Sequence, residues 1–263
     1  MTATEPSAAE PSATTAPPPL KTLFSRVRLR RDVPLHALAP VLVPADANAR
    51  LAVAHRLMWA LFPGSREQTR DFLWREELPG AGPGRGATYY LLSVRPPVDA
   101  HNLFEIDPPK PFAPRLAAGD RLGFVLRANP VVSRRTPGSR KSGKHHDVVM
   151  DRLHRLPLPK GERGPERQAA IEDAGRSWLS DQGGGHGFRL LQDEPLRVDG
   201  YDQVRVPREN GRKPVQFSVL DLEGRLVVTE PERFVAALSG GLGKARAFGC
   251  GLMLVRRLPV AGP

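Results

Sequence analysis

The sequence is short of several features that define whole classes of protein. Its single cysteine, Cys250, excludes a disulfide within the chain and a zinc site built from cysteines. No run of about 18 apolar residues occurs, so we expect no membrane-spanning helix. The first residues do not form a basic segment followed by an apolar core, so we also expect no secretory signal peptide. These absences favour a cytoplasmic protein. Because acidic metal ligands are not clustered, we expect no metal and no other cofactor.

Acidic residues are also few relative to basic ones. The 263 residues include 39 Lys and Arg but only 28 Asp and Glu, which gives a formal net charge of +11. An excess of this size favours a polyanionic partner, most simply a nucleic acid. A genome rich in G and C, which encodes many arginines, would also produce it. The 25 glycines and 28 prolines are too many for a helical bundle, whereas a hydrophobic fraction of 40% suffices for a buried core.

The N-terminal half of the chain divides by composition. Residues 1–20 are mostly Ala, Pro, Ser and Thr, and we expect a disordered tail there. A first domain is predicted for residues 21–116. Its expected elements are a strand at 22–31 with alternating apolar and basic positions, a helix at 47–62 capped by Asp46, strands at 71–78 and 87–94, and an edge strand at 102–116 that prolines interrupt.

A second domain is predicted for residues 117–263. Its expected elements are a strand at 120–132, a basic and loop-like arm at 133–163, a helix at 166–181 ended by three glycines, an extended segment at 188–208, strands at 215–220 and 225–228 around a turn at Glu223-Gly224, a helix at 232–239 and a strand at 250–257. The order of strands and helices repeats between the two halves. It predicts an α+β fold of two tandem ferredoxin-like (RRM-like) domains.

A glycine-rich segment lies between the last helix and the last strand. Residues 240–252 contain five glycines and the basic residues Lys244 and Arg246. The segment does not match a nucleotide-binding P-loop, because Ala245 follows the lysine and the segment precedes a strand. Glycines there can expose backbone N–H groups to phosphates, or they can let the loop pack tightly against a sheet. The spacing favours neither interpretation.

His55 is the histidine with the clearest catalytic potential. At helical spacing it lies with Leu51, Met58, Trp59 and Phe62, on or beside the buried face of the predicted helix. A histidine there can act as a general acid or base because its ordinary pKa is near 6.5. A hydrogen-bonded core histidine is the alternative, and it is the commoner case.

Much of the basic excess falls in three places, each a candidate RNA-binding cluster. The arm carries Arg134, Arg135, Arg140, Lys141 and Lys144. A predicted hairpin around Asn210-Gly211, the preferred type I′ turn, carries Arg205, Arg208, Arg212 and Lys213. The glycine-rich loop carries Gly241, Gly243, Lys244 and Arg246. Solvated surface charge explains any one cluster, but three together favour nucleic-acid binding.

Three segments resemble the CasE family, the endoribonucleases that process CRISPR RNA in type I-E systems. The first is His55-x-x-x-Trp59-x-x-Phe62-Pro63, followed by Arg70-Asp71-Phe72-Leu73. The second is Arg127-Ala128-Asn129-Pro130. The third is the glycine-rich motif at 241–252. Their order and spacing agree with the family from about residue 23 to residue 258.

The resemblance implies a function for this fold. It implies two tandem ferredoxin-like domains that bind the hairpin of a CRISPR repeat and cut it once, at the 3′ base of the stem. It places the catalytic histidine on His55, whereas Ala52 stands where some members carry a tyrosine. It also implies that the protein keeps its RNA product and joins other subunits of the Cascade complex.

The expected reaction uses the ribose 2′-OH as nucleophile and needs no metal in principle. His55 would be the general acid or base at the 2′-OH or at the 5′-oxygen, giving a 2′,3′-cyclic phosphate and a 5′-OH. A non-catalytic subunit that caps the hairpin of a guide RNA is the alternative. A DNA-binding regulator is weaker, because no helix-turn-helix pattern occurs.

Overall fold

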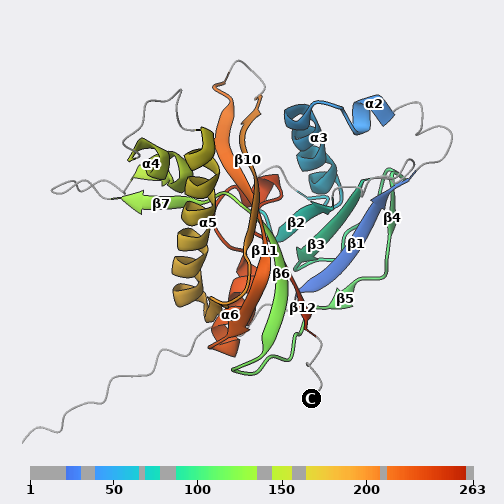
Figure 1. Ribbon diagram of the computed structural model, residues 1–263. Helices are drawn as coiled ribbons and strands as arrows, with labels where there is room; N and C mark the ends of the chain where they lie inside the picture. Colours follow the sequence, from blue (N-terminus) through green and yellow to red (C-terminus); the bar gives the residue numbers. More distant parts are fainter. Residues whose placement is uncertain are drawn as a thin grey trace, which may run out of the picture.

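The computed structural model describes residues 22–30, 39–64, 69–77, 87–134, 144–155, 164–207 and 212–258. Its N-terminal sheet is antiparallel with the order β2-β3-β1-β4, and β5 also pairs with β1 (Figure 1). The strands are β1 (Leu23–Leu29), β2 (Phe72–Glu77), β3 (Thr88–Ser93), β4 (Phe104–Ile106) and β5 (Lys110–Pro111). This order is that of a ferredoxin-like sheet, with the prolines on an edge, as predicted.

The alternation predicted for β1 is present. Val27 and Leu29 are buried, whereas Arg26 and Arg28 face outward. Both arginines form ion pairs with Asp107, at 2.7 and 2.9 Å, beside the neighbouring strand β4. The basic face of this strand is therefore neutralised within the protein and does not contribute free charge to a binding surface.

Helix α3 (Ala47–Ala60) follows the short helix α2 (Ala39–Leu42) and supplies the N-terminal core. The carboxylate of Asp46 accepts a hydrogen bond from the backbone N–H of Ala49 at 2.7 Å, which is the predicted N-cap. Met58 and the C-cap residue Leu61 are buried against the sheet. Residues 94–103, where a ferredoxin-like fold has its second helix, form an irregular connection.

The C-terminal sheet is antiparallel with the order β10-β11-β6-β12, and β9 pairs with β11. Its strands are β6 (Arg121–Ala128), β9 (Phe188–Leu190), β10 (Arg197–Val206), β11 (Val215–Val228) and β12 (Met253–Arg257). Helices α5 (Gly164–His186) and α6 (Pro231–Gly240) cross between the strands and cover one face (Figure 1). Two tandem ferredoxin-like domains are thus confirmed.

The two sheets meet on the side of the C-terminal sheet away from α5 and α6 (Figure 1). A small apolar cluster joins them, made of Leu73 and Leu92 from the N-terminal sheet and Leu252 beside β12. Each sheet also has a larger core of its own. No helix of the described residues is long and apolar enough to cross a membrane.

The prediction that three glycines end the helix after Asp181 is wrong. Helix α5 continues through them to His186. A glycine inside a helix is unfavourable by about 1 kcal/mol relative to alanine, which tertiary packing can offset. At Gly183 a Cβ would lie 2.5 Å from the carbonyl oxygen of Phe188, so the helix needs a glycine there to approach β9. The helix ends at Gly187, which has the left-handed φ of +76°.

The turn predicted at Glu223-Gly224 is also wrong. β11 is one continuous strand of 14 residues, and Gly224 pairs with Phe124 in its middle. A Cβ on Gly224 would lie 3.0 Å from Leu196 and 3.3 Å from the Phe124 ring. The glycine therefore permits a close approach within a strand, and it does not mark a turn.

The region from 120 to 163 is more structured than predicted. The expected strand 120–132 divides at Pro130 into β6 and β7 (Val131–Arg134). The arm predicted as a loop contains β8 (Lys144–Asp147), which pairs with β7, and helix α4 (Val148–His154). Asp147 caps this helix by accepting from the N–H of Met150 at 2.8 Å. The predicted tail, 1–20, lies outside the described residues, and the predicted domain boundaries stay predictions.

Candidate active site

His55 lies where the two halves of the chain meet. It is half-buried on α3, and its Nδ1 is 2.7 Å from the carbonyl oxygen of Ala247 in the glycine-rich loop. That loop contains a short 3-10 helix, η2 (Arg246–Phe248), which contacts both α3 and β2. A catalytic candidate from the first domain is thus oriented by the backbone of the second.

The carbonyl of Ala247 accepts two hydrogen bonds. Besides the contact with His55, the indole Nε1–H of Trp74 donates to it at 3.0 Å. A carbonyl oxygen can only accept, so Nδ1 of His55 must carry the proton of this bond. In the neutral ring the lone pair is then on Nε2, which has no hydrogen-bond partner among the described residues and can take a proton from a substrate.

Aromatic side chains lie next to the imidazole of His55. The ring of Phe248 lies 4.8 Å from that of His55, tilted by 30°, and the ring of Trp59 lies 6.4 Å away edge-on. Phe217, on β11, continues the row 5.3 Å beyond Phe248. These contacts limit the rotation of the ring, and the hydrogen bond from Nδ1 to Ala247 orients it.

The surroundings of His55 favour its neutral form. Burial lowers its pKa below the ordinary value of 6.5, although the hydrogen bond to Ala247 acts in the opposite direction. The positive charges of Arg56 and Arg70 lower the pKa further. The imidazole is therefore suited to accept a proton near neutral pH.

The glycine-rich loop is shaped by residues with positive φ. Ala245 (φ +52°) and Gly249 (φ +75°) flank η2, and Gly251 has φ +91°. A Cβ on Gly249 would lie 3.0 Å from the ring of Trp74, and one on Gly251 would lie 2.8 Å from the carbonyl of Leu242. The loop packs closely against β2, and this packing sets the position of the Ala247 carbonyl.

Gly241 and Gly243, predicted to bind RNA, also pack against the protein. A Cβ on Gly241 would lie 3.0 Å from Leu73, and one on Gly243 would lie 3.1 Å from Trp178. The N–H of Gly241 donates to the carbonyl of Ala237 at the end of α6. Tight packing alone accounts for these two glycines, and their contact with RNA stays a prediction.

The glycine-rich loop carries two basic residues that were predicted to bind RNA. Lys244 is exposed, and its backbone forms a β-bridge with Asn129. Arg246 is half-buried, and its Nε donates to the carbonyl of Gly243 at 3.1 Å. The loop therefore places Arg246 next to Ala247, the residue that contacts His55. Within the described residues no three His, Cys, Asp or Glu side chains are grouped to hold a metal ion.

Comparison with known proteins identifies the family. The family model described as "CRISPR associated protein" matches residues 24–257. The chain belongs to this CRISPR-associated family. It is 31% identical over 233 residues to the CRISPR-associated endoribonuclease Cse3 of Thermus thermophilus, which covers 82% of this chain and 96% of the relative. It is 24% identical over 217 residues to the CRISPR system Cascade subunit CasE of Escherichia coli K12, with the same coverage.

Solved structures of this family agree in fold. The structure of Thermus thermophilus Cse3 bound to an RNA representing a pre-cleavage complex has a TM-score of 0.60 and 27% identity, and the match covers 90% of this chain and 99% of that one. The Cas6e crystal structure from Escherichia coli has a TM-score of 0.53 and 22% identity, over 90% and 100% of the two chains. The second likeness concerns the fold alone.

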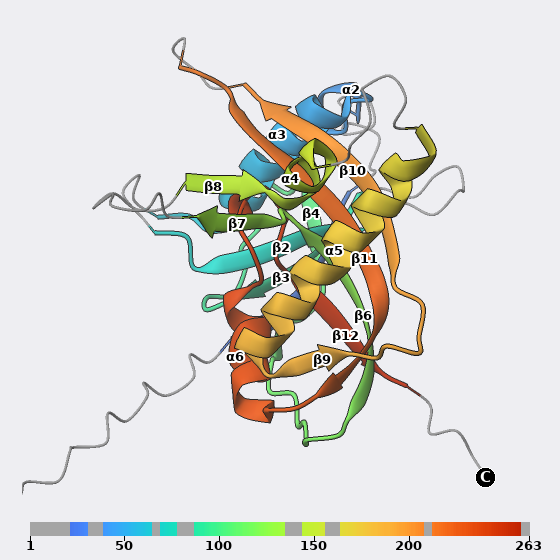
Figure 2. The ribbon, with the colours of Figure 1, turned by 60° about the vertical axis from the view of Figure 1, so that its left-hand side comes forward.

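In this CRISPR-associated chain the predicted basic hairpin is present beside α3. β10 and β11 are antiparallel up to the pair Val206–Val215, on either side of the predicted turn. Arg205, Arg212 and Lys213 are exposed near its end, whereas Arg208 lies outside the described residues. The backbone N–H of Arg205 donates to Asn48 of α3 at 2.9 Å. Figure 2 shows the hairpin alongside the helix that carries His55.

The basic arm is described only at its base. Arg134 is in β7 and pairs with Lys144 of β8 in the backbone register. Arg135, Arg140 and Lys141 lie outside the described residues. The hydroxyl of Tyr201 donates to Asp147 at 3.1 Å, which links the base of the arm to β10.

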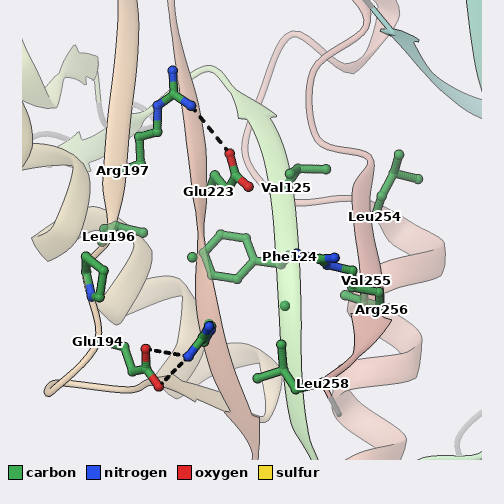
Figure 3. A pocket seen from close by; sticks show the side chains of 14 residues that line it. Phe124, Val125, Glu194, Leu196, Arg197, Glu223, Leu254, Val255, Arg256 and Leu258 are labelled. Carbon is green, nitrogen blue, oxygen red and sulfur yellow. Dashed lines mark hydrogen bonds and ion pairs between the residues drawn. The ribbon is translucent and has the colours of Figure 1, made fainter.

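A hollow of about 500 Å³ lies elsewhere, on the C-terminal sheet (Figure 3). Four of its charged groups form pairs: Arg225 lies 2.7 Å from Glu194, and Arg197 lies 3.8 Å from Glu223. Arg256 also lines the hollow. Neither His55 nor a residue of the glycine-rich loop lines it, so the hollow is separate from the site at His55.

Several residues near His55 were not predicted from the sequence to belong to the site. Trp74 and Phe248 have apolar or aromatic side chains typical of a core, and Ala247 acts through its backbone, so no side-chain pattern points to it. Arg70 was part of the motif that carries the resemblance, but its spacing alone suggested no role.

Proposed function

We propose that this chain, an endoribonuclease of the CRISPR-associated family, processes precursor CRISPR RNA by one cut at the 3′ base of each repeat hairpin. Support comes from the family match and from the names of its relatives, an endoribonuclease Cse3 and a Cascade subunit CasE. After cleavage the protein stays on its RNA product within an assembly of the Cascade type. We place it in the cytoplasm, and we assign the catalytic half to residues 21–116 and the second half to 117–263.

The observation that carries the mechanism is the hydrogen bond between His55 and Ala247. With Nδ1–H donated to the carbonyl, Nε2 of the neutral ring accepts the proton of the ribose 2′-OH as general base. The 2′-oxygen attacks phosphorus, the bond to the 5′-oxygen breaks, and the products are a 2′,3′-cyclic phosphate and a 5′-OH. The nucleophile belongs to the RNA, so the reaction proceeds without a metal ion.

The cationic clusters hold the RNA. Lys244 and Arg246 contact the backbone near the scissile bond, while the hairpin of β10 and β11 lies along the stem. Because the major groove of an RNA duplex is deep and narrow, contacts with phosphates dominate over contacts with bases. The basic arm adds further phosphate contacts.

A non-catalytic subunit that caps the hairpin of a guide RNA is the second candidate. At the position one turn before His55, where some members of the resembled family carry a tyrosine, this chain has Ala52, so no tyrosine at that position partners His55. Such a subunit would need the same basic clusters. It would not need His55.

The test is single-turnover cleavage of the matched repeat hairpin RNA in EDTA. We expect wild-type cleavage, a loss of at least a hundredfold for His55→Ala, and unchanged affinity of that variant for the RNA. A 2′-deoxy nucleotide at the cut site should abolish cleavage. If His55→Ala cuts as fast as wild type, the role of His55 is wrong, and if neither protein cuts but both bind, the second candidate is correct.

A further inference from the structure

Arg70 is a cationic group of the site that the mechanism above does not use. It is half-buried and lies two residues before β2. Its Nη1 is buried and has no hydrogen-bond partner within the described part of the chain. Buried polar nitrogens are almost always hydrogen-bonded in folded proteins, so this nitrogen can donate to a group that the described residues do not supply. Arg75 and Arg127 also have a buried nitrogen without a partner there.

Among the described residues, Arg70 has a second arginine beside it and no carboxylate paired with it. The neighbouring acid in sequence, Asp71, is 2.6 Å from Arg95 and is occupied by that pair. Burial lowers the pKa of Arg70, and the positive charge of Arg246 lowers it further. Within the same residues Arg246 forms no ion pair either, whereas Arg75 and Arg127, also partly buried, both face Asp221.

Both guanidiniums belong to segments that converge on the Ala247 carbonyl. β2 begins two residues after Arg70, and its Trp74 donates to that carbonyl together with His55. Arg246 is the residue before Ala247. The charge of Arg70 is close enough to lower the pKa of His55. Two unneutralised cations next to a proton acceptor repel each other, and binding of an anion between them relieves the repulsion.

We propose that Arg70 binds the scissile phosphodiester together with Arg246. The inference rests on the proposed function and adds a residue to it. As the 2′-oxygen bonds to phosphorus, the proton of the 2′-OH passes to Nε2 of His55, the bond to the 5′-oxygen breaks, and that oxygen takes a proton from water. Negative charge increases on the two non-bridging oxygens during this step. A guanidinium presents paired N–H groups to such oxygens, so Arg70 stabilises the transition state.

The test measures coupling between Arg70 and the phosphate. Two hairpin RNAs carry a 2′-deoxy nucleotide at the cut site, so neither is cleaved; one has the normal phosphate there and the other an uncharged methylphosphonate. We expect wild type to bind the methylphosphonate about tenfold or more weaker, the scale of a charged hydrogen bond. Arg70→Gln should discriminate between the two RNAs clearly less than wild type, because only Arg246 of the pair remains to contact the phosphate. Arg56→Gln, which removes an exposed charge next to His55, is the matched control and should keep the wild-type ratio.

The inference is overturned if Arg70→Gln discriminates between the two RNAs as strongly as wild type, or if wild type does not discriminate at all. Arg70→Lys keeps the charge and should retain part of the ratio, and the thermal midpoints of all variants show whether they fold. Failure of the proposed function looks different: wild type would then not cut the unmodified hairpin. If Arg70→Gln lost cleavage but kept the wild-type ratio of affinities for the two RNAs, Arg70 would be a structural residue that does not contact the phosphate.

Discussion

At the scale of single residues, the chemistry depends on which nitrogen of His55 carries a proton. The Ala247 carbonyl fixes that proton on Nδ1, and burial keeps the rest of the ring neutral. Sequence periodicity placed His55 correctly on or beside the buried face of its helix. It could not reveal its partner, because a backbone carbonyl 192 residues away has no signature in the sequence.

The pH dependence of cleavage should report this environment. A general base works only when it is neutral, so the single-turnover rate should increase with pH through the pKa of His55 and level off above it. Since burial and nearby cations lower that pKa, the midpoint should fall below pH 6.5. Arg56→Gln removes one of these cations, so its midpoint should shift to higher pH.

Arg233→Gln is the control for that shift. It removes the same charge from an exposed site on α6, where Arg233 pairs with Glu230, and should leave the midpoint in place. A midpoint that moves to lower pH in Arg56→Gln, or a rate that falls as pH rises through this range, would contradict a base role for His55.

At the scale of elements, local patterns predicted most strands and helices correctly, but they assigned two glycines to the wrong structural positions. Alternation identified β1, and Asp46 marked the start of α3, because both signals lie within a few residues of the element. Gly183 and Gly224 were assigned to a helix end and to a turn. Both instead lie inside regular elements where another segment approaches closely. What a glycine contacts is a tertiary property, so its role could not be predicted from its neighbours in sequence.

In the loop around η2, we expect a glycine to be replaceable by alanine only where the added Cβ does not point at β2. Gly249→Ala introduces a Cβ about 3.0 Å from the Trp74 ring at a φ of +75°. We expect destabilisation by about 1–2 kcal/mol and, because the Ala247 carbonyl shifts, a cleavage rate lower by tenfold to about a hundredfold. The measurements are single-turnover cleavage, thermal unfolding and binding of the 2′-deoxy hairpin.

Gly240→Ala is the matched substitution. Apart from its chain neighbours and the backbone of its own helix, no described atom lies within 4 Å of where its Cβ would be, and Gly240 is the last residue of α6. It should leave the rate unchanged. Equal rates for the two variants would show that the position of the loop does not control His55.

At the scale of the whole molecule, the site exists only while the two halves stay docked. Besides the apolar cluster of Leu73, Leu92 and Leu252, a charged group links the sheets. Asp221 on β11 lies 3.3 Å from Arg127 on β6 and 3.8 Å from Arg75 on β2. Burial lowers the pKa of Arg75, and the carboxylate of Asp221 opposes this. The carboxylate of Asp221 thus compensates the positive charges of Arg75 and Arg127, which are partly buried between the two sheets.

Asp221→Asn should weaken this junction. With the carboxylate gone, two cations face each other between the sheets, and we expect the free energy of unfolding to fall by about 1–3 kcal/mol. Urea unfolding followed by tryptophan fluorescence measures it. Glu230→Gln, which breaks an exposed pair with Arg233, should change stability by less than about 1 kcal/mol. Similar small effects for both variants would mean that Asp221 does not hold the interface.

By itself the sequence determined the two repeated α+β halves, the basic character and the candidate histidine, because periodicity, charge and short motifs are properties of neighbouring residues. Only the tertiary structure decided how these parts become a site. It placed the Ala247 carbonyl on Nδ1 of His55, set Arg70 beside Arg246, and neutralised the arginines of β1 with Asp107. The reason is physical: hydrogen bonds, desolvation and charge repulsion depend on distances of a few ångströms, and the chain creates those distances only when it folds.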